Sequence, residues 1–333
     1  MSAPRVAISL MPLENRRETL VATALAAERR GFDAFLLPET WAYDTPIVLG
    51  EIALKTERVT LGTGIVGVWS RSAGTLAMAA ATLAEMSGGR FVLGLGASTP
   101  QLTEGLHDVP FEAPVARLRR TLTQVRALLA GERIPLGVTA AARPLKLNVP
   151  AGPPVPIYLA ALGDASIRVA GELADGWMPF LYPRRCLAEG VARLREGAVR
   201  GGHPDRLPAV CPSMPTVVAE REEDARKGAA WFLSFYVVSM GTLYRASLVR
   251  QGFGKEVEAV LAANTPKFAG AVPPDADALL EELIVFGTPP QARARLARWH
   301  AAGAALPTLL LPPNLTAAQL EFTLDALRPP TRA

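Results

Sequence analysis

Short apolar runs alternate with amphipathic segments along almost the whole chain. The uninterrupted apolar runs predict strands that are buried on both faces, as in a parallel sheet. Segments with an apolar residue at every third or fourth position predict helices between these strands. We predict strands at 5–10, 33–38, 59–62, 91–95, 155–159, 176–180, 209–218 and 306–311, and helices at 17–30, 46–55, 73–86, 113–130, 164–174, 184–200, 222–233 and 316–327.

Eight strand–helix units in 333 residues predict an α/β fold, and they favour a closed (β/α)8 TIM barrel over an open doubly wound sheet. We expect a single barrel domain over residues 1–328 and a frayed tail at 329–333. Two excursions interrupt the alternation. Residues 131–154 are rich in proline and predict a small hairpin or a loop, whereas residues 233–290 predict either a lid or helical pair at the barrel mouth or a surface that covers the barrel or forms a dimer.

Composition narrows the class of protein. Half of the residues are apolar, which provides for a large core, and the net charge of +4 comes with no basic stripe interleaved with aromatic residues, which argues against nucleic-acid binding. Cys186 and Cys211 form no CxxC motif and have no histidine nearby, so we expect neither a metal site nor a disulfide framework. The chain has no signal-peptide pattern and no apolar run of membrane-spanning length, so we expect a cytoplasmic protein.

Two successive predicted strands end in glycine pairs, Gly62/Gly64 and Gly94/Gly96. Glycine at the carboxyl end of a strand lets the backbone approach a ligand closely. Two such ends side by side in a parallel sheet predict a floor for a flat cofactor. The run GTGIVG also matches the GxGxxG pattern of dinucleotide-binding folds, but no helix begins inside it, which argues against that type of site.

Three motifs in order resemble one family. They are LGTGIVGVWSRSAGTLAMAAATLAEMSGGRFVLGLGAS at 61–98, VPIYLAALGDASIRVAGELADGWMP at 155–179 and GFDAFLLPETW at 31–41. Together they resemble the bacterial luciferase-like monooxygenase superfamily of flavin- and deazaflavin-dependent oxidoreductases. The most similar branch is that of the coenzyme F420-dependent methylene-tetrahydromethanopterin reductases. With the barrel pattern, the resemblance covers nearly the whole chain.

The resemblance implies a cofactor ring that lies across the carboxyl ends of the barrel strands. It places a non-proline cis peptide at Gly64–Ile65, which would support the ring from behind. It places Gly96, Ala97 and Ser98 along the ring or its ribityl chain. The family's phosphate loop matches Ala160, Ala161, Leu162 and Gly163, just before a helix for which Asp164 is a plausible N-cap.

The resemblance also suggests residues for chemistry and for the substrate pocket. Glu39 lies at the end of the second strand, where acidic side chains of the family contact the ring, and is our candidate catalytic residue. The first strand carries Ser9 where the reductases have a glutamate proton donor, and serine does not replace that acid near neutral pH. The predicted substrate pocket comprises Ser9, Trp41, Arg71, Gln101 and His107, with an ion pair to a loop acid as the alternative role for Arg71.

We therefore expect an oxidoreductase that transfers a hydride between coenzyme F420 and a small organic substrate. One alternative is an FMN-dependent monooxygenase that uses reduced flavin and O2, and another is a folded partner or sensor without catalysis. The absence of a Ser–His–Asp or metal-ligand pattern in the sequence agrees with chemistry carried by an organic cofactor. The family also leads us to expect a homodimer, and the composition leads us to expect no binding to nucleic acid or to a membrane.

Overall fold

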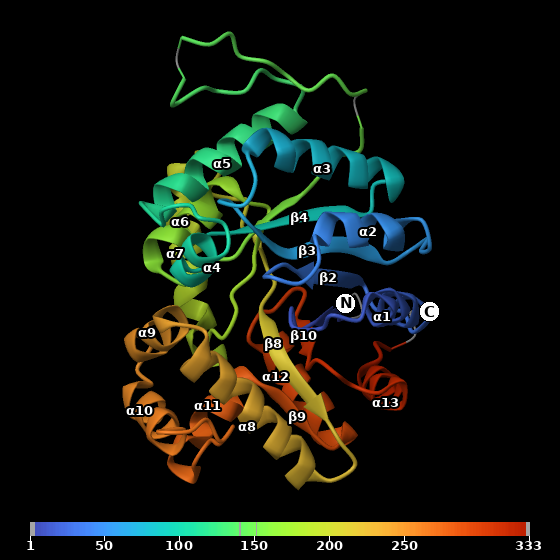
Figure 1. Ribbon diagram of the computed structural model, residues 1–333, viewed down its shortest axis with the longest axis vertical. Helices are drawn as coiled ribbons and strands as arrows, with labels where there is room; N and C mark the ends of the chain where they lie inside the picture. Colours follow the sequence, from blue (N-terminus) through green and yellow to red (C-terminus); the bar gives the residue numbers. More distant parts are fainter. Residues whose placement is uncertain (1–3, 140, 151, 331–333) are drawn as a thin grey trace.

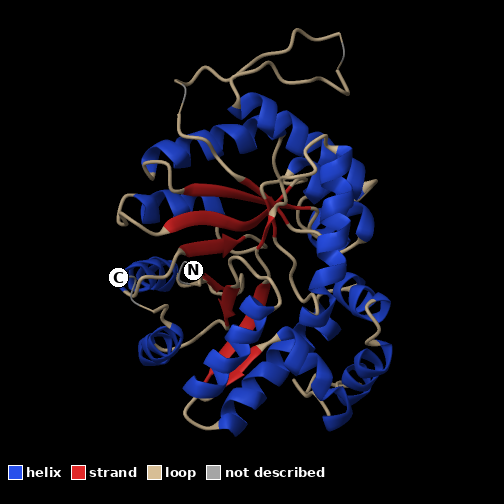
Figure 2. Ribbon diagram, turned by 180° about the vertical axis from the view of Figure 1, so that it is seen from behind, coloured by secondary structure: helices blue, strands red, loops and turns tan. Residues whose placement is uncertain are grey.

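The computed structural model describes residues 4–139, 141–150 and 152–330. A parallel sheet curls into a barrel, and helices cover its outside (Figures 1 and 2). The strands are β1 (Ala7–Leu10), β2 (Ala34–Pro38), β3 (Thr60–Gly67), β4 (Phe91–Gly96), β5 (Ile157–Leu159), β6 (Gly176–Trp177), β7 (Ala209–Val210), β8 (Ser213–Val218), β9 (Val285–Gly287) and β10 (Thr308–Leu311). The α-helices are α1 (Arg17–Arg29), α2 (Thr45–Ala53), α3 (Ala73–Met86), α4 (Pro100–Gly105), α5 (Pro114–Leu129), α6 (Asp164–Leu173), α7 (Leu187–Arg200), α8 (Glu222–Ser239), α9 (Thr242–Arg250), α10 (Gly254–Ala263), α11 (Asp277–Leu283), α12 (Pro289–Ala301) and α13 (Ala317–Leu327).

The barrel closes through the predicted strand at 209–218, which the structure divides into β7 and β8. On one side, the Cys211 amide donates to the Trp177 carbonyl at 2.8 Å. On the other side, the Pro212 carbonyl accepts from the Thr308 amide at 2.8 Å. β10 then pairs in parallel with β1, with Ser9 opposite Leu310. The predicted (β/α)8 barrel is therefore confirmed, with its seventh strand interrupted at Cys211 and Pro212.

The excursion that we predicted at 233–290 is shorter in the structure. Helix α8 continues to Ser239, and the segment also contains β9, which extends the sheet beyond the barrel by pairing with β8. The three-residue β9 was missed because so short an apolar run has no distinctive period. What remains of the excursion is α9, α10 and α11, which pack with α8 around a second apolar cluster.

The first excursion is a loop between α5 and β5. It projects beyond α3 and α5 (Figure 1), and the Ile134 amide donates to the Leu145 carbonyl at 2.8 Å, which joins its two limbs. Of the predicted frayed tail, residues 331–333 lie outside the described residues.

A bulge in β3 brings this strand very close to β4. The pairing register with β4 shifts between Gly62 and Val66, and the Thr63 hydroxyl exchanges hydrogen bonds of 2.7 Å with both the amide and the carbonyl of Gly94. A Cβ atom on Gly94 would lie 2.1 Å from the Thr63 carbonyl oxygen, so this contact requires glycine. GTGIVG lies within this bulged strand and does not begin a helix.

The predicted cis peptide at Gly64–Ile65 is wrong. Among the described residues, the cis peptide bond is Thr265–Pro266. The bulge in β3 appears as register shifts in its pairing with β2 and with β4, and the Gly64–Ile65 peptide bond within it is trans.

A layer of small and apolar side chains, including Ala7, Ala34, Cys211 and Leu306, fills the barrel interior near the amino ends of the strands. This layer separates a cavity at the carboxyl ends of the strands from a smaller one at their amino ends, beside Arg5 and Arg90. Within the described ranges, no single helix has the length and apolarity to cross a bilayer; α8 and α9 meet those criteria only as a pair bent by 103°.

Candidate active site

A cavity of about 340 Å³ opens at the carboxyl ends of the barrel strands. Its lining comes from the strand ends, from α8 and α9, and from the segment that leads into α5. The structure brings together in it most of the residues predicted from the sequence: Ser9, Glu39, Gly64, Ile65, Gly96, Ala97, Ser98, Ala160, Ala161, Leu162 and Gly163.

The ends of β3, β4 and β5 form one wall of the cavity. A Cβ atom on Gly96 would lie 3.0 Å from Ile65 Cδ1 and 3.5 Å from Ala160 Cβ, so a side chain at position 96 would crowd Ile65 and disturb this wall. Gly62 and Gly94 do not line the cavity. Of each predicted glycine pair, only the second member faces the site, whereas the first permits close packing of the strands.

The loop after β5 leads into the amino end of α6, whose first backbone amides have no partners within the helix. Gly163 is the N-cap, and the Ser166 hydroxyl donates to its carbonyl at 2.8 Å. Asp164 is therefore not the N-cap that the sequence suggested. Its side chain is 63% exposed and forms an ion pair with Arg193 at 3.1 Å. This pairing counters the repulsion that its carboxylate would exert on an anion at the helix end.

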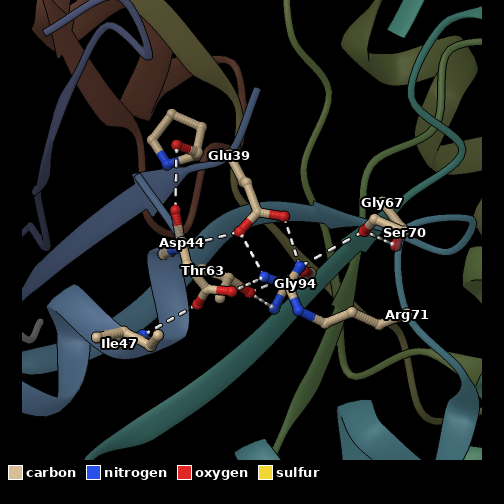
Figure 3. Close-up of polar contacts among 10 residues, drawn as sticks. Glu39, Asp44, Ile47, Thr63, Gly67, Ser70, Arg71 and Gly94 are labelled. Carbon is tan, nitrogen blue, oxygen red and sulfur yellow. Dashed lines mark hydrogen bonds and ion pairs between the residues drawn. The ribbon is translucent and has the colours of Figure 1, made fainter. Parts of the chain in front are cut away.

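Glu39 lines the cavity as one partner of a largely buried ion pair (Figure 3). Its Oε2 atom accepts from Arg71 Nη2 at 2.9 Å and from the Thr45 amide at 3.0 Å. The hydrogen bonds from Arg71 to Glu39, together with a contact to Asp44, raise the pKa of the Arg71 guanidinium. Glu39 therefore acts as a hydrogen-bond acceptor in the cavity wall. Its catalytic role stays a prediction.

Four residues predicted for the substrate pocket do not line the cavity. Arg71 takes its alternative role and pairs with Glu39 and Asp44. Trp41 is 48% exposed in the loop after β2, and His107 is exposed after α4. Gln101 lies on the outer side of α4, because the neighbouring Leu102 takes the position that faces the cavity.

The sequence alone does not show whether the aromatic residues of the second excursion line the pocket or lie in an interface. Tyr236 and Tyr244 line the cavity, whereas Phe253 is buried in the helical cluster beside it. Met240 also lines the cavity. Helical spacing could not have found this arrangement, because Tyr236 lies on α8 and Tyr244 on α9, and these helices meet at a bend of 103°.

Phe180 joins the two tyrosines in a cluster of edge-to-face rings. Its ring centroid lies 4.8 Å from that of Tyr236 and 5.5 Å from that of Tyr244, and the tyrosine rings lie 5.4 Å apart. Burial raises the pKa of Tyr236, with a contribution from Tyr244, and burial raises the pKa of Tyr244 to about 12. Both phenols are therefore protonated at neutral pH.

Comparison with known proteins identifies the family. The family model described as "Luciferase-like monooxygenase" matches residues 2–306. This chain belongs to the luciferase-like monooxygenase family. Over 316 residues it is 33% identical to a candidate coenzyme F420-dependent oxidoreductase of Mycobacterium tuberculosis, covering 88% of this chain and 89% of that protein. It is 26% identical to the 5,10-methylenetetrahydromethanopterin reductase of Methanolobus tindarius, covering 82% and 84% of the two chains.

The luciferase-like fold is also found by structural comparison. The coenzyme F420-dependent tetrahydromethanopterin reductase of Methanopyrus kandleri superposes with a TM-score of 0.74 at 18% identity, over 98% of each chain. At this identity the superposition establishes the fold alone. The family match makes the protein a luciferase-like oxidoreductase, and the cavity at the carboxyl ends of its strands is its candidate active site.

Proposed function

We propose that this luciferase-like protein is a cytoplasmic oxidoreductase that transfers a hydride between coenzyme F420 and a small organic substrate. The observation that carries the proposal is the glycine-lined wall at Gly64, Ile65 and Gly96, in a chain 33% identical to a relative named for F420.

The residues present fit a flat ring with a phosphate-bearing tail. Ile65, Ala97 and Ala160 offer apolar surface around Gly96. The amides at the start of α6 suit the phosphate, because a helix amino end favours anions. We infer that these two groups would hold the cofactor.

A bound deazaflavin supplies the hydride chemistry, and the protein supplies orientation and a dry environment. The ion pair with Arg71 fixes Glu39 in the wall near the bulge. Apolar side chains such as Leu102, Phe111 and Val115 exclude water from the cavity. Ser9 contributes a neutral hydroxyl at the position where the reductases that this chain resembles have a glutamate.

Titration of the purified protein with F420 and with FMN, followed by ring fluorescence and absorbance, tests this function. We expect tight F420 binding and weak FMN binding. Gly96→Val is expected to weaken F420 binding at least tenfold, because its side chain would crowd Ile65 and Ala160 and displace the wall. Gly105→Ala is the matched control, since a Cβ atom there meets nothing within 4 Å. Equal F420 affinity in the wild type, Gly96→Val and Gly105→Ala would show that this wall is not part of the cofactor site.

The second candidate is an FMN-dependent monooxygenase, which the description of the family model favours. The same titration separates the two functions. Preference for FMN, with oxygen uptake once the flavin is reduced, would replace our proposal by monooxygenation.

A further inference from the structure

The half of the cavity opposite β3, β4 and β5 is lined by hydroxyl groups. Thr308 on β10 and Ser213 on β8 lie opposite each other in register, and both line the cavity. Thr308 is 1% exposed, and its Oγ1 atom has no hydrogen-bond partner among the described residues. A buried hydroxyl without a partner costs stability unless something else supplies its hydrogen bond. This atom therefore marks a place where a polar ligand atom is expected.

The two tyrosines extend this hydroxyl surface. Phe180 pairs with Ser213 through a β-bridge, and its ring contacts those of Tyr236 and Tyr244, so the aromatic cluster borders the Ser213–Thr308 pair. For neither tyrosine hydroxyl is a hydrogen bond found within the part of the chain that the structure describes. The elevated pKa values keep both groups as donors.

Among the described residues, the buried part of this half, around Thr308 and Tyr236, offers no charged side chain to a ligand, and Arg250 on α9 is exposed. The only charged residues among the described lining are Glu39, which is paired with Arg71, and Arg250, which is exposed at the end of α9. A charged group buried between Thr308 and the tyrosines would therefore lack a partner, which is costly in an apolar surrounding. A neutral oxygen pays no such cost.

We propose that the surface formed by Ser213, Thr308, Tyr236 and Tyr244 is the substrate subsite and selects an uncharged carbonyl or alcohol group. The two phenols donate hydrogen bonds to that oxygen, and the apolar remainder of the molecule packs against Phe180, Met240 and Leu310. The inference deepens the proposed function, since it rests on assigning the opposite wall to the cofactor.

The test compares cyclohexanone with methylenecyclohexane, which has nearly the same shape but no oxygen, and with cyclohexanecarboxylate. Binding is measured by ligand-observed NMR for the wild type, Tyr236→Phe, Tyr244→Phe and the double variant, each with and without F420. The carbonyl stretch of bound ¹³C-labelled cyclohexanone is recorded by infrared spectroscopy. Tyr182→Phe is the matched control, because Tyr182 is also a buried tyrosine but does not line the cavity.

We expect the double variant to lose cyclohexanone affinity by about fivefold to tenfold while its affinity for methylenecyclohexane is unchanged, as loss of one or two hydrogen bonds predicts. The carbonyl stretch should move to higher wavenumber in the double variant and stay in place in Tyr182→Phe. Cyclohexanecarboxylate should bind the wild type more weakly than cyclohexanone.

Three results would overturn the inference: no cyclohexanone binding to the wild type, an unchanged carbonyl stretch in the double variant, or tighter binding of the carboxylate. If the double variant is unstable, the single variants and Thr308→Val provide the same comparison. Failure of F420 to bind, with these ketone results intact, would reject the proposed cofactor and leave the subsite standing.

Discussion

At the scale of single residues, the Glu39–Arg71 ion pair places a polar group in the cavity wall beside the bulge in β3. The two side chains are 11% and 14% exposed, and they come from segments 32 residues apart. Each charge is satisfied largely by the other, since taking either out of water alone is costly. The pair therefore holds the end of β2 against the loop after β3.

We predict that Arg71→Met lowers the free energy of unfolding by about 2–3 kcal/mol, because it leaves the Glu39 carboxylate half-paired in a buried site. Adding Glu39→Gln should recover part of this loss by removing the charge. Arg221→Met is the control: its partner Asp224 is exposed, and the change should stay within about 0.5 kcal/mol. Urea unfolding gives the free energy of unfolding of the wild type and the three variants. Equal losses for Arg71→Met and Arg221→Met would show that the burial of the Glu39–Arg71 pair does not matter.

At the scale of elements, Glu14 links the loop after β1 to the loop after β10. It accepts hydrogen bonds from Arg16 Nε at 2.7 Å and from the Asn314 amide at 3.0 Å. Burial opposes ionisation of the carboxyl group, but the hydrogen bonds from Arg16 and Asn314 outweigh it, so the pKa of Glu14 is lowered. Ionised Glu14 thus stabilises the folded protein above the unfolded-state pKa of about 4.3.

We predict that Glu14→Gln destabilises the protein at pH 7 by about 1–3 kcal/mol. The difference from the wild type should shrink as the pH falls below about 4.3 and the wild-type carboxylate takes up its proton. Glu258→Gln, at an exposed position of α10, is expected to have little effect at either pH. Urea unfolding at pH 7 and at about pH 3 checks this, and a pH-independent difference would show that ionisation of Glu14 is not the cause.

At the scale of the whole molecule, α2 and α3 expose four large apolar side chains on neighbouring helices. Ile47, Leu54, Met78 and Met86 are between 36% and 75% exposed, and a Cβ atom on Gly50 of α2 would lie 3.5 Å from Met86 Cε. Exposed apolar side chains on two helices that pack together suit a subunit interface. Because a twofold interface uses the same patch on both subunits, we propose that this face pairs with that of a second copy.

We therefore predict a homodimer by size-exclusion chromatography with light scattering. The double variant Leu54→Glu with Met78→Glu should be monomeric, because it buries four like charges across the twofold axis. Val199→Glu on α7, at a position that is 64% exposed, should leave the dimer intact. A monomeric wild type would reject the interface.

The sequence by itself determined the barrel, its family and one wall of the cavity. Strand burial, helix periodicity and the small residues at Gly64, Gly96 and Ala160–Gly163 are signals carried by neighbouring positions, so they can be read along the chain. The residues predicted to contact the cofactor ring, from Gly64 and Ile65 to Gly96–Ser98, therefore all line the cavity as expected.

Only the tertiary structure decided which side of each element faces the cavity. It turned Trp41, Gln101 and His107 outward, paired Arg71 with Glu39, and formed the bulge with a trans peptide. It also brought Tyr236 and Tyr244 to Ser213 and Thr308. These outcomes depend on close packing between elements far apart in the sequence, and the local pattern of polar and apolar residues does not encode those contacts.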